Sequence, residues 1–106
     1  MFKKLFQIQQ LLQAGEREFP AQLVAIFLCI ADNDGCTQSE LAEATGFSPS
    51  SVSRCVSWLG AHHRLAHRSG KGWVERKVCP QNHKARRVYL TRQGKEICRQ
   101  ISQILA

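Results

Sequence analysis

The sequence predicts a single, mainly α-helical domain with one small β-hairpin, and three observations support this fold class. Its 106 residues are enough for one modest hydrophobic core. Apolar residues recur at helical spacing in several segments, whereas residues 73–90 alternate with a period of two. A glycine at position 46 separates two short helical segments and marks a tight turn between them. We therefore treat residues 1–106 as one domain.

The first two helices are predicted from the spacing of their apolar residues. A helix within residues 1–15 follows from apolar residues at helical spacing, namely Phe2, Leu5, Ile8 and Leu12. Residues 21–31 are apolar on nearly every side, as in a central helix surrounded by others. The run DNDG at residues 32–35 lacks the ligand spacing of a calcium loop, so we interpret it as the turn that ends this helix.

Residues 37–61 are predicted to form a pair of helices joined by a short turn. Thr37 and Glu40 have the spacing of a capping box, in which each side chain accepts a hydrogen bond from the other residue's backbone N–H. Gly46 ends the first helix, because a residue without a Cβ adopts a left-handed backbone at little cost. Ser48-Pro49 then begins the second helix with an N-cap and a first-turn proline. This is the pattern of a helix-turn-helix.

The second helix of this pair has two faces of different chemistry. Its apolar face consists of Val52, Cys55, Val56 and Leu59. The remaining positions carry small hydroxyls and one cation: Ser50, Ser51, Ser53, Arg54 and Ser57. Such a face allows close approach to phosphates and base edges, so we predict a recognition helix that enters a nucleic-acid groove. The alternative is a helix that only completes the core.

Residues 73–90 are predicted to form a hairpin, and residues 91–106 a last helix. The strands are expected at Trp73–Val78 and Arg86–Leu90, separated by residues 79–85 with the turn at residues 80–82. Thr91 is the expected N-cap of the final helix, whose apolar stripe begins at Ile97. Helices, a helix-turn-helix, a hairpin and a closing helix follow one another in the order of a winged helix-turn-helix.

Positive charge is concentrated in one part of the chain. The formal charge is +7 overall, but residues 54–87 contain nine Lys and Arg against one acid, and all four histidines. A basic patch attracts polyanions, which makes double-stranded DNA the predicted partner. We expect affinity to come from phosphate contacts of residues 64–87 and to fall with salt, and specificity to come from the recognition helix. The alternative is a solvated basic surface.

Two stretches, TQSELAEATGFSPSSVSRCV from Thr37 and WVERKVCPQNHKARRVYLTRQGKEI from Trp73, resemble the winged-helix core of the MarR family of bacterial transcription regulators. The most specific features are the helix-turn-helix spacing and the run VYLT at residues 88–91 with Gly94 shortly after. In length, and in the added segment 64–72, the chain is most similar to the short members carried by phages and prophages. The resemblance implies a dimer that places each recognition helix in a major groove of a roughly palindromic site and each wing against a minor groove. We predict that it represses or otherwise controls transcription by occupying an operator.

The predicted DNA contacts combine the recognition helix, its flanks and the wing. They are Thr37, Ser48, Ser50, Ser51, Ser53, Arg54, Ser57, Arg76, Asn82, His83, Lys84 and Arg86. The wing departs from the family pattern, because Asn82-His83 stands where an acidic residue is usually followed by arginine. The usual wing salt bridge is therefore missing, and Lys84 is expected to take over part of the arginine's role.

Both ends of the chain carry more apolar surface than a lone domain of this size readily covers, which predicts a homodimer. The predicted dimerisation residues are Phe2, Leu5, Phe6, Ile8, Ile97, Ile101, Ile104 and Leu105. The alternative is that the two terminal helices simply pack on each other. A small-molecule inducer is not expected, because the family's ligand pocket depends on longer terminal helices than this chain provides.

Other chemistry finds little support in the sequence. The five cysteines include no CxxC pair, so we expect reduced thiols in the cytoplasm, in a DNA-binding protein associated with the nucleoid. Cys29, Cys55 and Cys98 are expected to be buried, whereas Cys36 and Cys79 are candidates for exposed redox switches. We predict no metal, no cofactor, no catalytic group, no secretory signal and no membrane span.

Two other functions remain open on the same scaffold. One is a nucleic-acid-binding accessory factor in phage or plasmid replication or recombination. The other is a protein-binding adaptor that uses the apolar stripes of the terminal helices. Activity that stays unchanged after replacement of Arg54 would favour the adaptor.

Overall fold

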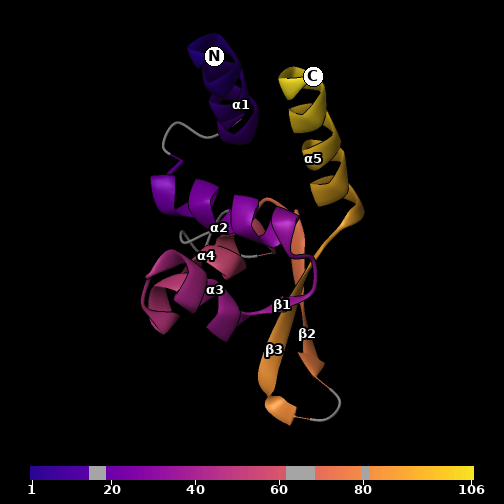
Figure 1. The fold of residues 1–106 in the computed structure, drawn as a ribbon. Helices are drawn as coiled ribbons and strands as arrows, with labels where there is room; N and C mark the ends of the chain where they lie inside the picture. Colours follow the sequence, from indigo (N-terminus) through magenta and orange to yellow (C-terminus); the bar gives the residue numbers. More distant parts are fainter. Residues whose placement is uncertain (15–18, 62–68, 80–81) are drawn as a thin grey trace.

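The fold was analysed in a computed structural model that describes residues 1–14, 19–61, 69–79 and 82–106. These residues form the predicted winged helix-turn-helix (Figure 1). The elements, in chain order, are α1 (Phe2–Gln13), α2 (Ala21–Asp32), β1 (Cys36–Thr37), α3 (Gln38–Thr45), α4 (Pro49–Leu59), β2 (Val74–Cys79), β3 (Asn82–Leu90) and α5 (Arg92–Leu105). Helices α1 and α5 lie together at the end that carries both termini, and the β2–β3 hairpin extends from the opposite end.

The helix-turn-helix forms through the local signals that the sequence contains. The Thr37 N–H donates to Glu40 Oε1 at 3.0 Å, and the Glu40 N–H donates to Thr37 Oγ1 at 3.1 Å, which completes the capping box. Gly46 ends α3 in the left-handed conformation with a φ of 78°. Ser48 Oγ accepts from the Ser51 N–H at 3.2 Å and caps α4. Both predicted helices are therefore confirmed.

Strand β1 was not predicted, and it changes how the parts are connected. The sheet is antiparallel with the order β1-β3-β2. Cys36 pairs with Val88 and Thr37 with Arg87, so the residue that caps α3 is also part of the sheet. A strand of two residues is too short to show a period-two pattern, so no sequence pattern predicted it. The pairing joins the start of the helix-turn-helix to the wing.

The wing hairpin is longer than predicted. Strand β2 begins at Val74 and reaches Cys79, and β3 begins at Asn82 instead of Arg86, so the predicted boundaries of the hairpin turn were wrong. Cys79 pairs with Asn82, with a shift of register between Val78 and Cys79. Residues 82–85 are polar or small and show no hydrophobic alternation in the sequence, so the period-two pattern could not locate the start of this strand.

The core is built around α2, which packs against the helix-turn-helix. Leu23, Ile26, Phe27 and Ile30 are buried along α2, as expected of a central helix. Each such side chain contributes roughly 1.5–3 kcal/mol through removal of apolar surface from water. The Trp73 ring at the start of the wing lies 5.1 Å from that of Phe27, measured between centroids. The same core thus supports the recognition helix and the base of the wing.

The four cysteines whose side chains are described are buried or half-buried. Cys55 is buried as predicted, while Cys29 and Cys98 are half-buried rather than buried. Cys36, a candidate for an exposed redox switch as against an ordinary free thiol, is only 7% exposed, and burial raises the pKa of its thiol to about 11. The reactive thiolate is therefore scarce at neutral pH, which argues against a redox switch at this position. The side chain of Cys79 lies outside the described residues.

A first prediction concerns the contact between α5 and the base of the wing. A Cβ on Gly94 would lie 2.0 Å from the Trp73 carbonyl oxygen. We expect Gly94→Ala to lower the free energy of unfolding by about 1–3 kcal/mol, although alanine is intrinsically the better helix former. Urea unfolding would measure this, with Gln103→Ala on the exposed side of α5 as the control. Equal stability of the two variants would contradict the close approach.

A second prediction concerns Cys36. We expect iodoacetamide at pH 8 to modify the half-buried Cys29 and Cys98 faster than Cys36 in the native protein, because burial disfavours the Cys36 thiolate. Peptide mapping after a short reaction would show the order. In denaturant the difference in labelling rate should vanish. Labelling of Cys36 in the native protein as fast as that of Cys29 and Cys98 would contradict the prediction.

Candidate nucleic-acid interface

The recognition helix α4 buries one side and presents the other to solvent. Val52, Cys55, Val56, Trp58 and Leu59 are buried. On the outer side Ser50 and Arg54 are exposed and Ser51 is half-buried. Arg54 Nη2 donates to Ser51 Oγ at 3.3 Å, which orients the guanidinium along the outer side of the helix. This side therefore offers one cation and several small hydroxyls.

Three serine hydroxyls gather at the N-terminus of α4. Ser48 Oγ donates to Ser51 Oγ at 3.0 Å and lies 3.3 Å from Ser50 Oγ. A helix N-terminus carries a partial positive charge, and small hydroxyls beside it leave the backbone accessible to an anion. The arrangement suits a phosphate or the edge of a base.

The two remaining predicted serines of α4 turn toward the wing. Arg76 Nη1 donates to Ser57 Oγ at 3.0 Å, and Nη2 donates to the Ser53 carbonyl oxygen at 2.5 Å and to Ser53 Oγ at 3.2 Å. Arg76 Nε donates to Gln38 Oε1 in α3 at 2.6 Å. The guanidinium is half-buried, and burial, with a smaller effect of Arg86, lowers its pKa. The predicted contact face is therefore divided into an outer part and a part that contacts β2.

Thr37 lies at the junction of β1 and α3. Its hydroxyl accepts from the Glu40 N–H, and its own backbone N–H donates to the Glu40 carboxylate, which lowers the pKa of that carboxyl. The hydroxyl thus has a defined role at the N-terminus of α3. The structure places Thr37 beside β3 and not on the outer side of α4.

The wing carries cations with different surroundings. Arg86 and Arg87 are exposed, but Arg87 Nη1 donates to the Gly35 carbonyl oxygen at 2.9 Å. Lys77 Nζ lies 3.5 Å from Glu75 Oε1 and 5.1 Å from the centre of the Tyr89 ring. Exposed ion pairs of this kind contribute little to stability. The side chains of Asn82, His83 and Lys84, which were predicted to contact DNA, lie outside the described residues.

Contacts that the sequence did not reveal hold this region together. Asp34 Oδ1 accepts from the Leu90 N–H at 2.8 Å, which joins the turn after α2 to the end of β3. Gln38 supplies the acceptor for Arg76 Nε. No local motif predicts either contact, because the two partners lie 38 and 56 positions apart in the chain. Only the folded chain brings these groups together.

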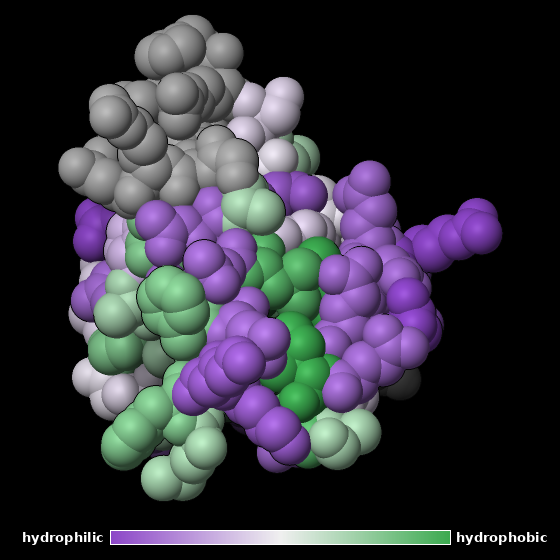
Figure 2. Space-filling model, turned by 90° about the horizontal axis from the view of Figure 1, so that it is seen from above, coloured by the Kyte–Doolittle hydropathy of each residue, from purple (hydrophilic) through white to green (hydrophobic). Residues whose placement is uncertain are grey.

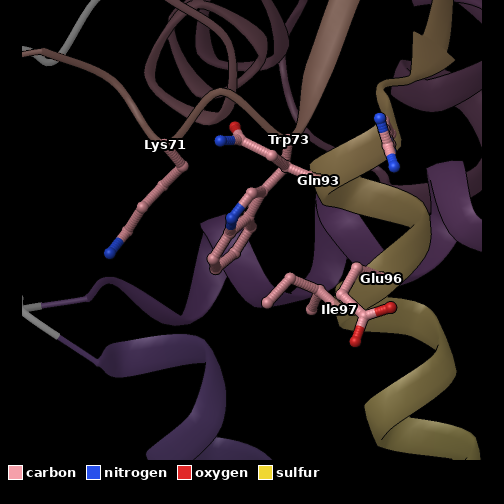
Figure 3. A pocket seen from close by; sticks show the side chains of 6 residues that line it. Lys71, Trp73, Gln93, Glu96 and Ile97 are labelled. Atoms are coloured by element: carbon pink, nitrogen blue, oxygen red, sulfur yellow. The ribbon is translucent and has the colours of Figure 1, made fainter.

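A hollow of about 580 Å³ lies between the start of the wing and α5 (Figure 3). Its lining comprises Lys71, Trp73, Arg92, Gln93, Glu96 and Ile97. Lys71 Nζ donates to the Ala14 carbonyl oxygen at 3.1 Å, and Glu96 accepts hydrogen bonds from Arg99. Two of the charged groups around the hollow therefore already have intramolecular partners.

The predicted dimerisation residues fall into two groups. Ile101 is buried and Ile8, Ile97 and Ile104 are half-buried, where α1 and α5 meet. Phe2, Leu5, Phe6 and Leu105 are 77%, 54%, 62% and 56% exposed. Figure 2, which views the molecule from the end with the two termini, shows apolar side chains lying open among hydrophilic ones. The terminal helices thus pack on each other and still leave an apolar surface.

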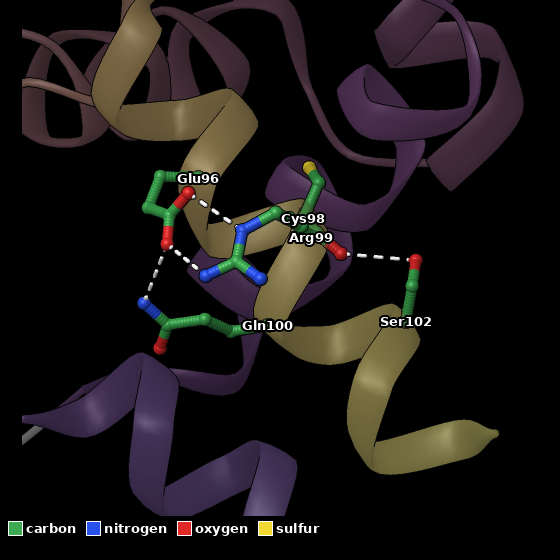
Figure 4. A network of polar contacts seen from close by, with 5 residues as sticks. All are labelled: Glu96, Cys98, Arg99, Gln100 and Ser102. Carbon is green, nitrogen blue, oxygen red and sulfur yellow. Dashed lines mark hydrogen bonds and ion pairs between the residues drawn. The ribbon is translucent and has the colours of Figure 1, made fainter.

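The outer side of α5 is polar. Arg99 donates to both carboxylate oxygens of Glu96, and Gln100 Nε2 donates to Glu96 Oε1 at 3.3 Å (Figure 4). These hydrogen bonds, with Arg99 as the largest cause, lower the pKa of Glu96 to about 2. The charged network marks a part of α5 that faces water.

No metal site or membrane span emerges from the described residues. Among residues 1–14, 19–61, 69–79 and 82–106, His, Cys, Asp and Glu side chains nowhere gather in threes. His62, His63 and His67 lie outside these ranges. None of the helices in the described part is both long enough and apolar enough to cross a membrane.

Comparison with known proteins identifies the architecture. The family model described as winged helix-turn-helix DNA-binding matches residues 23–60. Apo wild-type MarR from E. coli is 25% identical, with a TM-score of 0.65 over 98% of this chain and 68% of that one. PcaV from Streptomyces coelicolor is 22% identical, with a TM-score of 0.66 over 98% and 71%.

FabT from Streptococcus pneumoniae, solved in complex with DNA, is 20% identical with a TM-score of 0.67, over 96% of this chain and 66% of that one. No curated protein gives a significant match. The matched segment covers α2, β1 and the helix-turn-helix, and the solved structures share the wing and terminal helices as well. The chain is therefore a winged helix-turn-helix protein with the fold of the MarR-like transcriptional regulators.

Proposed function

We propose that the protein is a MarR-type transcriptional regulator that binds double-stranded DNA in the cytoplasm as a homodimer and represses transcription from a palindromic operator. The observation that supports this most is the outer side of α4, where Ser50, Ser51 and Arg54 face solvent at the capped start of the helix. Small hydroxyls permit close approach to the groove, and arginine is the side chain that most often pairs with guanine.

The basic charge supports the same partner. Arg54 on α4 and Arg86 and Arg87 on β3 are exposed cations, and β3 is joined through β1 to the helix-turn-helix. A duplex that meets α4 in its major groove would therefore meet the wing in an adjacent groove. The MarR-like fold and the DNA-bound FabT structure are consistent with this arrangement.

The proposed dimer uses the exposed apolar group Phe2, Leu5, Phe6 and Leu105. Lys4 Nζ donates to the carbonyl oxygens of Leu105 and Ala106 at 3.4 and 3.2 Å, which holds the two chain ends beside each other. A two-fold arrangement of these ends would present two recognition helices to two half-sites. No catalytic role is part of this proposal.

The direct test is selection of binding sites from a random duplex library at near-physiological salt, followed by titration of the selected and a scrambled duplex. A palindromic sequence with strong preference supports the proposal. Salt-sensitive binding without preference would favour the accessory role in replication or recombination, and absence of binding would favour the protein-binding adaptor.

Arg54 is predicted to carry specificity. We expect Arg54→Ala to cost about 1–3 kcal/mol of binding free energy at the selected site and to reduce the preference for it. Lys84→Ala serves as the matched loss of charge and should weaken binding to all duplexes alike. Titration by fluorescence anisotropy measures both. Equal losses on selected and scrambled DNA for Arg54→Ala would contradict this division of roles.

Phe6 is predicted to lie in the dimer interface. Phe6→Glu places a charge in an apolar contact, so we expect it to sediment as a monomer at a micromolar concentration at which the wild type is a dimer. Val78→Glu, at a 51% exposed position near the tip of the wing, is the control and should leave the dimer intact. A wild-type monomer at that concentration would contradict the proposal.

A further inference from the structure

We propose that Arg76 is a positioning residue, whose guanidinium fixes the recognition helix relative to the wing instead of contacting DNA. The inference deepens the proposed DNA-binding function and rests on it. It also replaces the expectation, drawn from the sequence, that Arg76 belongs to the contact surface. Its basis is the set of hydrogen bonds that Arg76 makes within the protein.

The guanidinium of Arg76 connects three elements with all three of its nitrogens. Nε donates to Gln38 Oε1 in the first turn of α3 at 2.6 Å. Nη1 donates to Ser57 Oγ at 3.0 Å, and Nη2 donates to the carbonyl and hydroxyl oxygens of Ser53 at 2.5 and 3.2 Å. Because Arg76 belongs to β2, the side chain joins the wing directly to both helices of the helix-turn-helix.

Only a planar fork of N–H donors can make this set of contacts. Arginine presents five N–H donors in fixed directions, whereas the lysine ammonium is a single point from which donors radiate. The acceptors here lie on two different helices. Lysine at this position would keep the positive charge but reach fewer of the acceptors. The Arg76→Lys variant therefore distinguishes the effect of the charge from the effect of the hydrogen bonds.

The surroundings of Arg76 make a phosphate contact costly. The partners named above are neutral acceptors, and the side chain is half-buried, so burial lowers the pKa of the guanidinium. Four of the five N–H donors already go to Gln38, Ser57 and Ser53, so a bidentate phosphate contact would require the side chain to give up some of these acceptors. The exposed cations Arg86 and Lys77 are nearer to solvent and carry no such penalty.

The sheet register closes a loop around this side chain. Arg76 pairs with Val88, and Val88 pairs on its other side with Cys36. The next residue, Thr37, caps α3, whose first residue Gln38 accepts from Arg76. A backbone path through the sheet and a direct side-chain path therefore connect the same two elements, which restricts the angle between wing and helix-turn-helix.

The test compares Arg76→Lys and Arg76→Ala with the wild type on the selected and scrambled duplexes at several salt concentrations. We expect both variants to lose about tenfold or more of the preference for the selected site. The slope of affinity against salt should stay at the wild-type value, because no phosphate contact is lost. The proposal would be overturned by a slope of log affinity against log salt reduced by about one, by equal losses of affinity on both duplexes, and by wild-type binding of Arg76→Lys.

Two further variants test the contacts themselves. Gln38→Ala and Ser57→Ala should each reproduce part of the loss of preference, and neither should add its full effect to Arg76→Ala in a double-mutant cycle. Fully additive effects of these substitutions on the preference would overturn the proposed role of Arg76. Lys77→Ala removes a neighbouring cation that is 62% exposed and should leave the preference unchanged. If Arg76→Ala does not fold, Gln38→Ala and Arg76→Lys give the same comparison.

Amide hydrogen exchange provides a readout that does not depend on DNA. We expect Arg76→Lys to speed exchange in β2 and in the second half of α4, and Lys77→Ala to leave both unchanged. A wild type without preference for any duplex would contradict the proposed function alone, and the exchange experiment would still test the positioning role. Unchanged exchange in Arg76→Lys would overturn that role.

Discussion

The antiparallel pairing of β1 with β3 is the constraint on which the interface depends. Cys36 and Thr37 are the only two residues of β1, yet they connect the turn after α2, the cap of α3 and the central strand of the sheet. The Asp34 carboxylate and the Arg87 guanidinium add side-chain bonds on either side of this pairing. The pairing therefore fixes the start of the helix-turn-helix against the wing, and the Arg76 hydrogen bonds connect the same two parts a second time.

The cations of the protein divide into those that hold the fold and those that face solvent. Arg76 is half-buried and donates to oxygens on other elements, Arg87 donates to the Gly35 carbonyl oxygen while remaining exposed, and Arg54 and Arg86 are exposed. A count of basic residues treats all of them alike, although only exposed cations can release counterions from a phosphate backbone. The salt dependence of binding should therefore reflect fewer charges than the sequence contains.

The candidate site was predicted in outline, and the structure reorganised it. Ser50, Ser51 and Arg54 lie on the outer side of α4 as the helical periodicity required. Ser53 and Ser57 share that polar side in sequence, but both accept hydrogen bonds from Arg76 of β2, which lies 23 and 19 positions further along the chain. Helical periodicity separates buried from polar positions, yet it cannot say which polar positions another element will cover.

The sequence by itself determined the local elements: the capping box at Thr37, the left-handed turn at Gly46, the cap at Ser48 and the apolar stripe of α2. These signals act within a few residues, so they survive without tertiary context. The tertiary structure alone decided the strand β1, the length of the wing, the burial of Cys36 and the partners of Arg76. Each of these depends on groups far apart in the chain, and a sequence pattern records only what neighbouring residues impose on one another.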